Sequence, residues 1–531
     1  MACSTCQTNY SGEPLGWLAR PRTRTCCDDD STQHPTSLHT PYGRISRLLT
    51  LIPTAADRAM TKFPKHPIAP LCLTLALVAG AGETALCQVD AITVSSIGTT
   101  AASPADATER LQAAIDDSTG ILELPAGIHV ISRPLVIDLR KTKCREVRGN
   151  AATEVRMVGP GPAFRVLGSH YKSAAPAGFT EQVWTDERMP TFVGFGIRGD
   201  HKEADGIQAT GTMQLTASRM HLRKLQHGVH LVENNRNVII ENCHIYECSG
   251  VGIYYDDVNL HQSNIVGCHV SYCDAGGLVS RGGNVRNIHI SGSDFEGNMS
   301  AKSPATANIL IDCRTSEYGT AEVAITGCTI QHTDDGPDSA NIRIFGTSKR
   351  GAVSPSNNER SDSFGPNEGN ITITGNVLSD VQHNIHLNGC RGVTVVANTL
   401  WMGFTHNMLV ENCSYVVATG NNMDRNPRYD YGNSTTSKNL VVFENCRRCT
   451  IDALSISNIT AGPAIEFRDY EDMLCSKLAV FDAPLAIRLS NVSNSIFSSC
   501  MLRTSNGRPR VEVSGGHHNE LGNLEAYARD D

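Results

Sequence analysis

Five residues with ionisable side chains occupy matching places within short alternating segments of this chain. They are Asp256, Arg281, Asp312, Arg343 and His386. Carboxylates and imidazoles transfer protons at neutral pH, and arginines neutralise negative charge on a substrate or in a transition state. We therefore predict these five as the catalytic candidates of an enzyme that acts on an acidic substrate.

One reaction open to this set is hydrolysis of a glycosidic bond. An inverting glycosidase needs two carboxyl groups about 6.5–9.5 Å apart. We expect Asp256 and Asp312 on the same face, two turns of the repeat apart, with their backbones roughly 9.6 Å from each other. The adjacent pairs Asp256–Asp257 and Asp334–Asp335 are alternatives.

The other reaction is β-elimination at a uronic acid. Arg281 and Arg343 are suited to neutralise the sugar carboxylate, and His386 or an arginine to remove the proton from C5. Calcium held by Asp256, Asp312 and a loop carboxylate is a further option, because hard oxygen ligands suit this ion. No fixed metal site is predicted.

Other residues of the same segments, and of one loop, are suited to bind an acidic sugar. They combine aromatic rings, amides and charges, as ligand sites do. The predicted substrate-binding residues are Tyr254, Phe345, Asn388, Glu411, Arg428, Tyr429 and Tyr431. Insertions flank these segments at residues 299–306, 313–320, 332–339, 346–369 and 424–438. Because function concentrates on such loops, we expect them to wall a groove.

The segments that carry these residues form a repeat. From Gly228 to Glu411 the chain reads GVHLVEN, GIYYDDV, GLVSRGG, NILIDC, NIRIFG, NIHLNG and NMLVEN, with a second series such as VIIENC and ITITGN between them. A period of about 22–25 residues with two or three short strands is typical of a solenoid. We predict an all-β fold, a single-stranded right-handed parallel β-helix of about eleven coils.

Alternation within each strand separates core from surface. Side chains two residues apart share a face of a strand. The apolar positions Val229, Ile253, Leu278, Ile309, Ile342, Ile385 and Met408 are therefore expected to point inward. The catalytic candidates then lie in two outward columns. The cysteines also fall in columns, which we interpret as small buried residues stacked in a ladder rather than as disulfides.

The two ends of the chain differ from this repeat. Residues 1–59 lack sustained periodicity and are interpreted as a disordered or untranslated leader. Residues 60–87 resemble a signal peptide, with a basic start after Met60 and an apolar run too short to span a bilayer. They predict a secreted, periplasmic or cell-surface protein without a membrane span. Residues 88–531 form the predicted β-helix domain, with a capping helix at about 106–117, coils at about 121–515 and a tail at 516–531.

The stretch DATERLQAAID, from Asp106, is followed by LPAG and ISRPL. This opening resembles the pectate-lyase-like superfamily, in particular right-handed β-helix proteins of the polygalacturonase and rhamnogalacturonase type. The resemblance implies that fold, but members differ in reaction. The polygalacturonase motifs N-T-D, D-D, G-H-G and R-I-K do not occur in order, and Asp256–Asp257 supplies only the second of them. The D-P-H-D motif of alginate epimerases is missing too.

The net charge of the chain limits the classes of molecule that are expected to bind it. The formal net charge is −8, which argues against nucleic acid as a partner. We therefore expect a secreted carbohydrate-active protein that cleaves an acidic polysaccharide by β-elimination or hydrolysis in a groove on the first strand ladder. The alternative is a non-catalytic β-helix, such as a glycan-binding rod, a surface adhesin or a structural protein. The sequence does not indicate an oligomeric state.

Overall fold

The computed structural model describes residues 105–172, 176–349, 368–505, 510–522, 524 and 526–528. All of them belong to the compact unit Ser96–Asp531. The predicted leader and signal peptide lie outside the described residues and stay predictions. Within the described part of the chain, no helix is long and apolar enough to cross a membrane.

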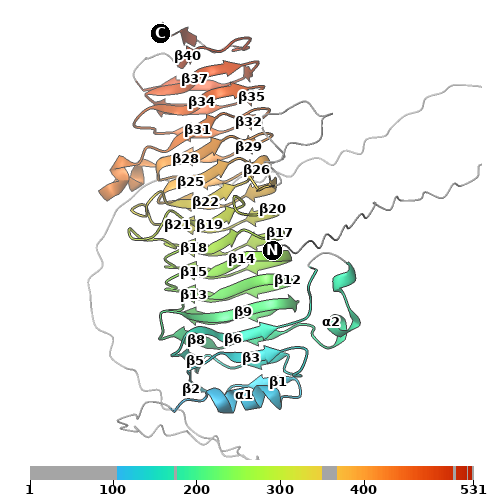
Figure 1. The fold of residues 1–531 in the computed structure, drawn as a ribbon. Helices are drawn as coiled ribbons and strands as arrows, with labels where there is room; N and C mark the ends of the chain where they lie inside the picture. Colours follow the sequence, from blue (N-terminus) through green and yellow to red (C-terminus); the bar gives the residue numbers. More distant parts are fainter. Residues whose placement is uncertain are drawn as a thin grey trace, which may run out of the picture. The chain divides into compact units, whose positions relative to one another are not determined.

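The chain winds into stacked coils, each of which contributes to up to three strand ladders (Figure 1). The first ladder consists of β3 (Leu135–Asp138), β6 (Gly161–Leu167), β9 (Ala204–Met213), β12 (Val229–Glu241), β14 (Ile253–Val266), β16 (Leu278–Arg281), β19 (Ala307–Asp312), β22 (Ala340–Phe345), β25 (Val381–Asn388), β28 (Gly403–Glu411), β31 (Leu440–Glu444), β34 (Pro463–Glu471), β37 (Leu485–Ser493), β40 (Val511–Ser514) and β41 (Ala526–Ala528).

The second ladder follows a corner of the coil. It consists of β1 (Ile121–Glu123), β4 (Glu146–Arg148), β7 (Thr191–Val193), β10 (Thr216–Ser218), the ends of β12 and β14, β17 (Asn284–Ser291), β20 (Gly319–Thr326), β23 (Gly369–Thr374), β26 (Arg391–Val396), β29 (Val417–Thr419), β32 (Thr450–Asp452), β35 (Leu474–Ser476) and β38 (Ile496–Ser498). Because β12 and β14 run through the corner, these two ladders join into one 27-stranded sheet.

The third ladder is a separate 14-stranded sheet. It consists of β2 (Gly127–Ile131), β5 (Thr153–Met157), β8 (Gly196–Gly199), β11 (His221–Arg223), β13 (His244–Tyr246), β15 (His269–Ser271), β18 (Asp294–Glu296), β21 (Thr329–Gln331), β24 (Val377–Ser379), β27 (Thr399–Leu400), β30 (Asn422–Asp424), β33 (Ser455–Ser457), β36 (Ala479–Ala483) and β39 (Met501–Thr504). Neighbouring coils pair in parallel, as between β12 and β14 and between β13 and β15. The predicted all-β parallel solenoid is confirmed.

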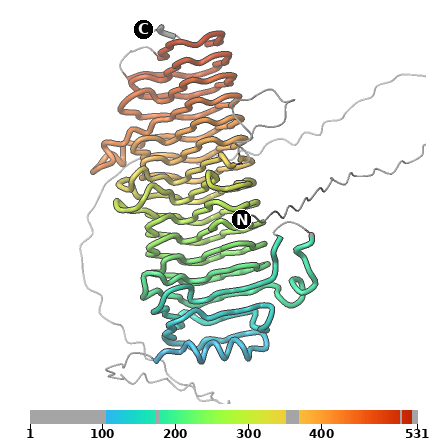
Figure 2. The backbone as a smooth tube through the Cα atoms, viewed as in Figure 1, coloured from blue at the N-terminus to red at the C-terminus, as the bar shows by residue number. Residues whose placement is uncertain are grey.

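The number of coils follows from the third ladder. Its fourteen strands indicate fourteen coils in the described part of the chain, three more than the eleven predicted, because β2, β5 and β8 precede residue 206 and eleven strands follow it. Successive coils lie almost directly over one another (Figure 2). The three early coils are harder to recognise in the sequence because a long connection, residues 168–190, separates β6 from β7.

Short elements cover the end of the stack and decorate its sides. Helix α1 (Thr108–Asp116) lies under the first coils with Leu111 and Ile115 buried, as the capping prediction requires (Figure 1). The side loops hold η1 (Pro176–Gly178), α2 (Glu181–Thr185), η2 (Pro427–Tyr429) and η3 (Gly432–Thr436). At the other end, β41 pairs with β40, so the segment predicted as a tail adds a further strand to the first ladder.

The core is apolar but contains a column of buried amides. The seven apolar positions that were predicted to point inward all have an exposed fraction of 0%. Beside them, the side-chain amide of Asn308 donates to Asn341, Asn341 to Asn384 and Asn384 to Asn407, each at 2.8 Å. Each of these three donors thus has an acceptor in the next coil, which offsets the cost of burying it, whereas the side-chain nitrogen of Asn407, the last of the four, is buried without a partner. The thirteen cysteines among the described residues are all free thiols, and all but Cys500 are buried.

Candidate functional site

The outward positions of the first ladder form two columns in register. One joins His230, Tyr254, Val279, Leu310, Arg343, His386 and Leu409, and the other joins Val232, Asp256, Arg281, Asp312, Phe345, Asn388 and Glu411. Val279 and Leu310 are nevertheless 1% and 2% exposed, because they pack with Val251, Ala307 and Ala340. This apolar patch divides the face into two polar clusters.

The first, the Asp256 cluster, consists of Asp205, His230, Tyr254, Asp256 and Arg281. Its centre is the ring of His230, which lies between two carboxylates. Nδ1 is 3.2 Å from Oδ2 of Asp205, and Nε2 is 3.0 Å from Oδ2 of Asp256. The Asp205 side chain is almost buried, whereas that of Asp256 is 40% exposed. Asp256 is therefore the member of the triad that a substrate can reach.

The charges in this triad follow from its geometry. Burial lowers the pKa of His230, but the hydrogen bonds and charges of Asp205 and Asp256 outweigh it and raise the pKa to about 9. His230 is therefore a cation at neutral pH. Its hydrogen bond in turn holds the pKa of Asp256 below the usual range of a carboxyl group, so that Asp256 is ionised.

Tyr254 and Arg281 complete the cluster. The Tyr254 ring stacks on His230, with centroids 5.3 Å apart, and it also contacts His227 at 5.0 Å. Burial, together with the charge of Asp256, raises the pKa of Tyr254 to about 12, so its phenol keeps its proton. The Arg281 side chain is 47% exposed and lies 3.8 Å from Asp312. The exposed cation of Arg281, the protonated phenol of Tyr254 and the carboxylate of Asp256 thus lie together on the adjacent strands β14 and β16.

Asp312 does not serve as the second carboxylate of a hydrolase pair. Both of its oxygens accept hydrogen bonds from Arg314, each at 2.8 Å, and the residue is 6% exposed. Burial favours the neutral acid, but Arg314 outweighs it and lowers the pKa of Asp312. Arg314 in turn lies over the ring of Phe345, 3.8 Å from its centroid. The pairing of Asp256 with Asp312 is therefore corrected, because a turn residue that the strand pattern does not include captures Asp312.

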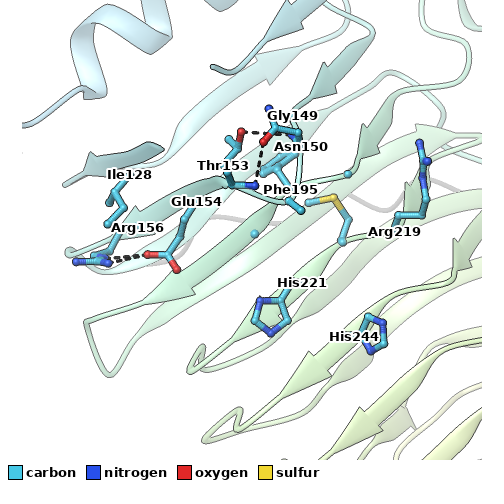
Figure 3. Close-up of a pocket in the computed structure, with 15 residues that line it drawn as sticks. Ile128, Gly149, Asn150, Thr153, Glu154, Arg156, Phe195, Arg219, His221 and His244 are labelled. Carbon is cyan, nitrogen blue, oxygen red and sulfur yellow. Dashed lines mark hydrogen bonds and ion pairs between the residues drawn. The ribbon is translucent and has the colours of Figure 1, made fainter. Parts of the chain in front are cut away.

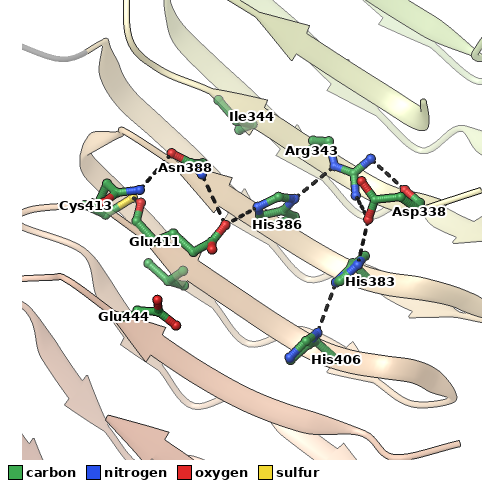
Figure 4. Close-up of polar contacts among 12 residues, drawn as sticks. Asp338, Arg343, Ile344, His383, His386, Asn388, His406, Glu411, Cys413 and Glu444 are labelled. Carbon is green, nitrogen blue, oxygen red and sulfur yellow. Dashed lines mark hydrogen bonds and ion pairs between the residues drawn. The ribbon is translucent and has the colours of Figure 1, made fainter. Parts of the chain in front are cut away.

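The second polar cluster is the His386 cluster, built on β22, β25 and β28 (Figure 4). Nε of Arg343 donates to Nδ1 of His386 at 3.0 Å, and Nε2 of His386 lies 2.8 Å from Oε2 of Glu411. Since Nδ1 accepts a hydrogen bond, the ring is neutral and its N–H is at Nε2. This N–H donates a hydrogen bond to Glu411. Burial lowers the pKa of His386, in agreement with this state. Asn388 also donates to Glu411, at 3.1 Å.

An ion pair between the buried Arg343 and the half-exposed Asp338 holds this cluster in place. Nη2 of Arg343 lies 2.9 Å from Asp338, and Asp338 also meets Nε2 of His383 at 2.9 Å. The Nδ1 atoms of His383 and His406 are 3.1 Å apart, and burial lowers the pKa of His406 to about 4. Three of these side chains, Asp338, His383 and His406, come from residues that the sequence did not single out, and Asp338 lies in an insertion.

The roles predicted for Arg343 and His386 are corrected. Arg343 is 2% exposed and His386 is 7% exposed, so neither side chain is open to the solvent. Backbone carbonyl groups of Thr306 and Asp338 also accept hydrogen bonds from Arg343. The guanidinium fixes the ring of His386, and His386 fixes Glu411, which is the accessible end of the chain of contacts.

The predicted binding residues fall into three places. Tyr254 belongs to the Asp256 cluster and Glu411 to the His386 cluster. Phe345 and Asn388 line a hollow of about 340 Å³ with Arg314, Thr347, Ser348 and Lys349. Most of the adjacent insertion, residues 350–367, lies outside the described residues.

The loop that carries Arg428, Tyr429 and Tyr431 forms η2 and η3. Tyr429 packs on Trp401 with ring centroids 4.6 Å apart, and Tyr431 is 65% exposed. Asn433 of the same loop donates to Asp334, which joins two insertions at one edge of the first ladder. The structure brings none of the three predicted residues into either polar cluster.

Asp205 and His227 were missed because they lie outside the repeated segments. Asp205 lies near the start of β9, before the segments in which the repeat is clear in the sequence, and its carboxylate also accepts a hydrogen bond from the backbone N–H of His227. Among the described residues, no group of three His, Cys, Asp or Glu side chains is arranged to hold a metal ion. The calcium site suggested for Asp256 and Asp312 is not formed by these side chains, because the guanidinium of Arg314 binds the carboxylate of Asp312.

Comparisons with known proteins agree with this architecture. Residues 199–313 match the family model of a right-handed β-helix region. The chain is therefore a right-handed parallel β-helix protein, as predicted, and its fold is consistent with the pectate-lyase-like superfamily that the opening resembles. A search of curated proteins finds no match by sequence.

Among solved structures, three that align with most of this chain do so at low identity. The A-module of a mannuronan C-5 epimerase from Azotobacter vinelandii is 12% identical, with a TM-score of 0.36, over 80% of this chain and 94% of that one. A mutant tailspike of E. coli bacteriophage HK620, in complex with a pentasaccharide, is 11% identical, with a TM-score of 0.46, over 78% and 75%. The catalytic unit of a GH87 α-1,3-glucanase from Streptomyces thermodiastaticus is 12% identical, with a TM-score of 0.37, over 81% and 68%. At these identities and TM-scores the likeness carries no argument about this chain.

Proposed function

We propose that this protein cleaves an acidic polysaccharide by β-elimination, with the Asp256 cluster as the reaction centre. The observation that carries the proposal is the position of Asp256. It is an ionised carboxylate, 40% exposed, that a protonated His230 holds beside the phenol of Tyr254 and in register with Arg281. Asp256 supplies a base, Tyr254 an acid and Arg281 a cation for the sugar carboxylate. These are the three kinds of group that the reaction requires.

Each group has a defined part in the elimination. Arg281 pairs with the carboxylate of a uronosyl residue and so stabilises the negative charge that develops when C5 loses its proton. Asp256 accepts that proton. The electrons of the C5–H bond form the double bond between C4 and C5, the bond from C4 to the glycosidic oxygen breaks, and Tyr254 gives its proton to the departing oxygen.

Hydrolysis is the less favoured reaction for this arrangement. It needs a second carboxyl group, on the opposite side of the scissile bond, that gives or takes a proton. Asp205 is buried against His230, and Asp312 is bound by Arg314. Neither is free to play that part.

The His386 cluster extends the same face. Asp256 lies on β14 and Glu411 on β28, five coils further along the ladder, which corresponds to roughly 24 Å at the spacing of parallel strands. A chain of several sugars spans this distance. Phe345, Asn388 and Glu411 are suited to contact sugars distant from the bond that breaks. The predicted signal peptide would place the protein outside the cytoplasm, where such polymers occur.

An activity screen tests the proposal. The protein is incubated with pectic and alginate-type polyuronates, and the ultraviolet absorbance of unsaturated uronates is followed in parallel with new reducing ends, in the presence of calcium or of a chelator. We expect both signals to rise together, since each elimination creates one double bond and one reducing end. Reducing ends without absorbance would indicate hydrolysis. Polymer binding without either signal would support the alternative of a non-catalytic glycan-binding rod.

A further inference from the structure

A second hollow lies away from the first ladder, on the outer face of the third. It measures about 820 Å³ and is lined by residues of β2, β5, β8, β11 and β13 and of the turns that lead into β5, β8 and β11 (Figure 3). Pockets of a few hundred to about a thousand Å³ are the usual size of small-molecule sites. Neither the Asp256 cluster nor the His386 cluster contributes a residue to it.

The hollow exists because one outward position of the third ladder lacks a side chain. Register places Gly196 between Glu154 and His221, and His244 follows in the same column. A Cβ atom at Gly196 would meet its nearest neighbours at 3.5 Å or more, and the backbone there is not left-handed. Neither space nor conformation therefore demands glycine at this position, and its effect is to open a gap in the column.

The charges around the gap are unequal. Arg156, which lines the hollow, is neutralised by Glu154 at 2.7 Å, and nearby Arg198 by Asp200 at 3.0 Å. Arg219 is exposed at the rim and, within the described part of the chain, its guanidinium has neither an ion pair nor a hydrogen bond. Figure 3 draws no contact from Arg219 or His221 to the other residues shown. The rim thus presents a guanidinium whose preferred partner, a carboxylate, is missing.

The remaining lining suits a sugar ring. Asn150, Glu154 and His221 offer hydrogen-bonding groups, and the exposed side chain of Ile128, at 46%, offers an apolar surface. Such a mixture of polar groups and an apolar wall fits a molecule with hydroxyl groups on its edge and C–H groups on its face. We propose that this hollow is a second, non-catalytic binding site for a uronic acid, with Arg219 as the counter-ion of the sugar carboxylate.

This site holds the polymer on a different face from the reaction centre. It stands apart from the proposed cleavage, because it uses no residue of the first ladder. A short acidic saccharide that binds both places should therefore show two sites per chain.

Titration calorimetry with trigalacturonate tests the site, with maltotriose as the neutral probe. We expect two sites in the unaltered protein, one of which is lost in Arg219→Gln and in Gly196→Leu, which fills the gap. We expect the dissociation constant of this site to rise about tenfold or more, the usual effect of removing a charge-assisted hydrogen bond. Arg223→Gln is the matched control, because Arg223 lies on the same face, pairs with Glu247 at 3.0 Å and does not line the hollow.

The variant Arg281→Gln separates this site from the groove. It should remove the other binding event and leave the one that depends on Arg219. Unchanged binding in both Arg219→Gln and Gly196→Leu, with normal circular dichroism, would overturn the proposed hollow, and so would equal affinity for maltotriose. Binding that depends on Arg219 but not on Arg281 would support the second binding site in the hollow. It would argue against the Asp256 cluster as the place where the polysaccharide is cleaved.

Discussion

Nε2 of His230 lies 3.0 Å from Oδ2 of Asp256, while Nδ1 of the same ring faces the almost buried Asp205. The histidine is therefore an internal cation that connects a structural carboxylate to an accessible one. Because both ring nitrogens are engaged, His230 has no proton to offer a substrate without breaking one of these contacts. Its part is to keep Asp256 ionised and oriented.

Asp256→Asn should abolish the proposed cleavage while the fold persists. The amide cannot accept the C5 proton, so we expect kcat to fall about a hundredfold to ten-thousandfold, the usual contribution of a general base. The measurement is the initial rate of unsaturated product. Asp482→Asn, at an exposed position remote from the cluster, is the control and should leave the rate unchanged. Equal rates for the two variants would remove Asp256 from the reaction.

Stability should depend on pH through His230. Its pKa is raised from 6.5 to about 9 in the folded protein. Protonated His230 therefore contributes about 3 kcal/mol to the free energy of unfolding. This contribution is fully present below about pH 6.5 and is lost as the pH rises through about 9. The check is the denaturation midpoint as a function of pH. His230→Gln should lower the midpoint at neutral pH and flatten the change in this range. An equally steep profile in the variant would contradict the assignment.

Arg343→Met should destabilise the protein more than it affects contacts with a sugar. The substitution keeps an unbranched apolar stem as far as the position of Nε but leaves His386 and two backbone carbonyl groups without their donor. We expect a loss of about 3 kcal/mol in the free energy of unfolding, moderated because Asp338 is half exposed and can be hydrated. Denaturant titration measures this loss. Arg428→Met, at an exposed loop position, should have little effect, and a similar loss in both would show that burial of Arg343 is not the cause.

The column of buried asparagines should be sensitive to a single change. Asn341→Leu removes an acceptor from Asn308 and a donor from both Asn384 and the carbonyl group of Ser379. Leaving buried polar groups without partners costs about 1–3 kcal/mol each, so the denaturation midpoint should fall clearly. Asn433→Ala, on the surface, provides the comparison. A midpoint equal to that of the unaltered protein would mean that water replaces the lost amide.

The sequence by itself determined the winding of this protein. The repeat period places one residue of each coil over its counterpart in the next, and the two-residue period of a strand separates Ile253 and Leu278, which point inward, from Asp256 and Arg281, which point outward. Leu111 and Ile115, spaced for one helical face, likewise predict the cap. These features depend on local geometry and on burial, both of which a repeating pattern records.

Only the tertiary structure decided which polar groups of a column are available. Arg314, in the turn that follows, donates hydrogen bonds to Asp312. Arg343 is buried and donates to backbone carbonyl groups of two insertions. Asp205 reaches His230 from the preceding coil, although their register partners are different residues. A strand pattern gives the face of each residue but neither the rotamer of its side chain nor the path of the loop beside it. Hydrogen bonds and desolvation are set by those two, and they decide between a free carboxylate and a neutralised one.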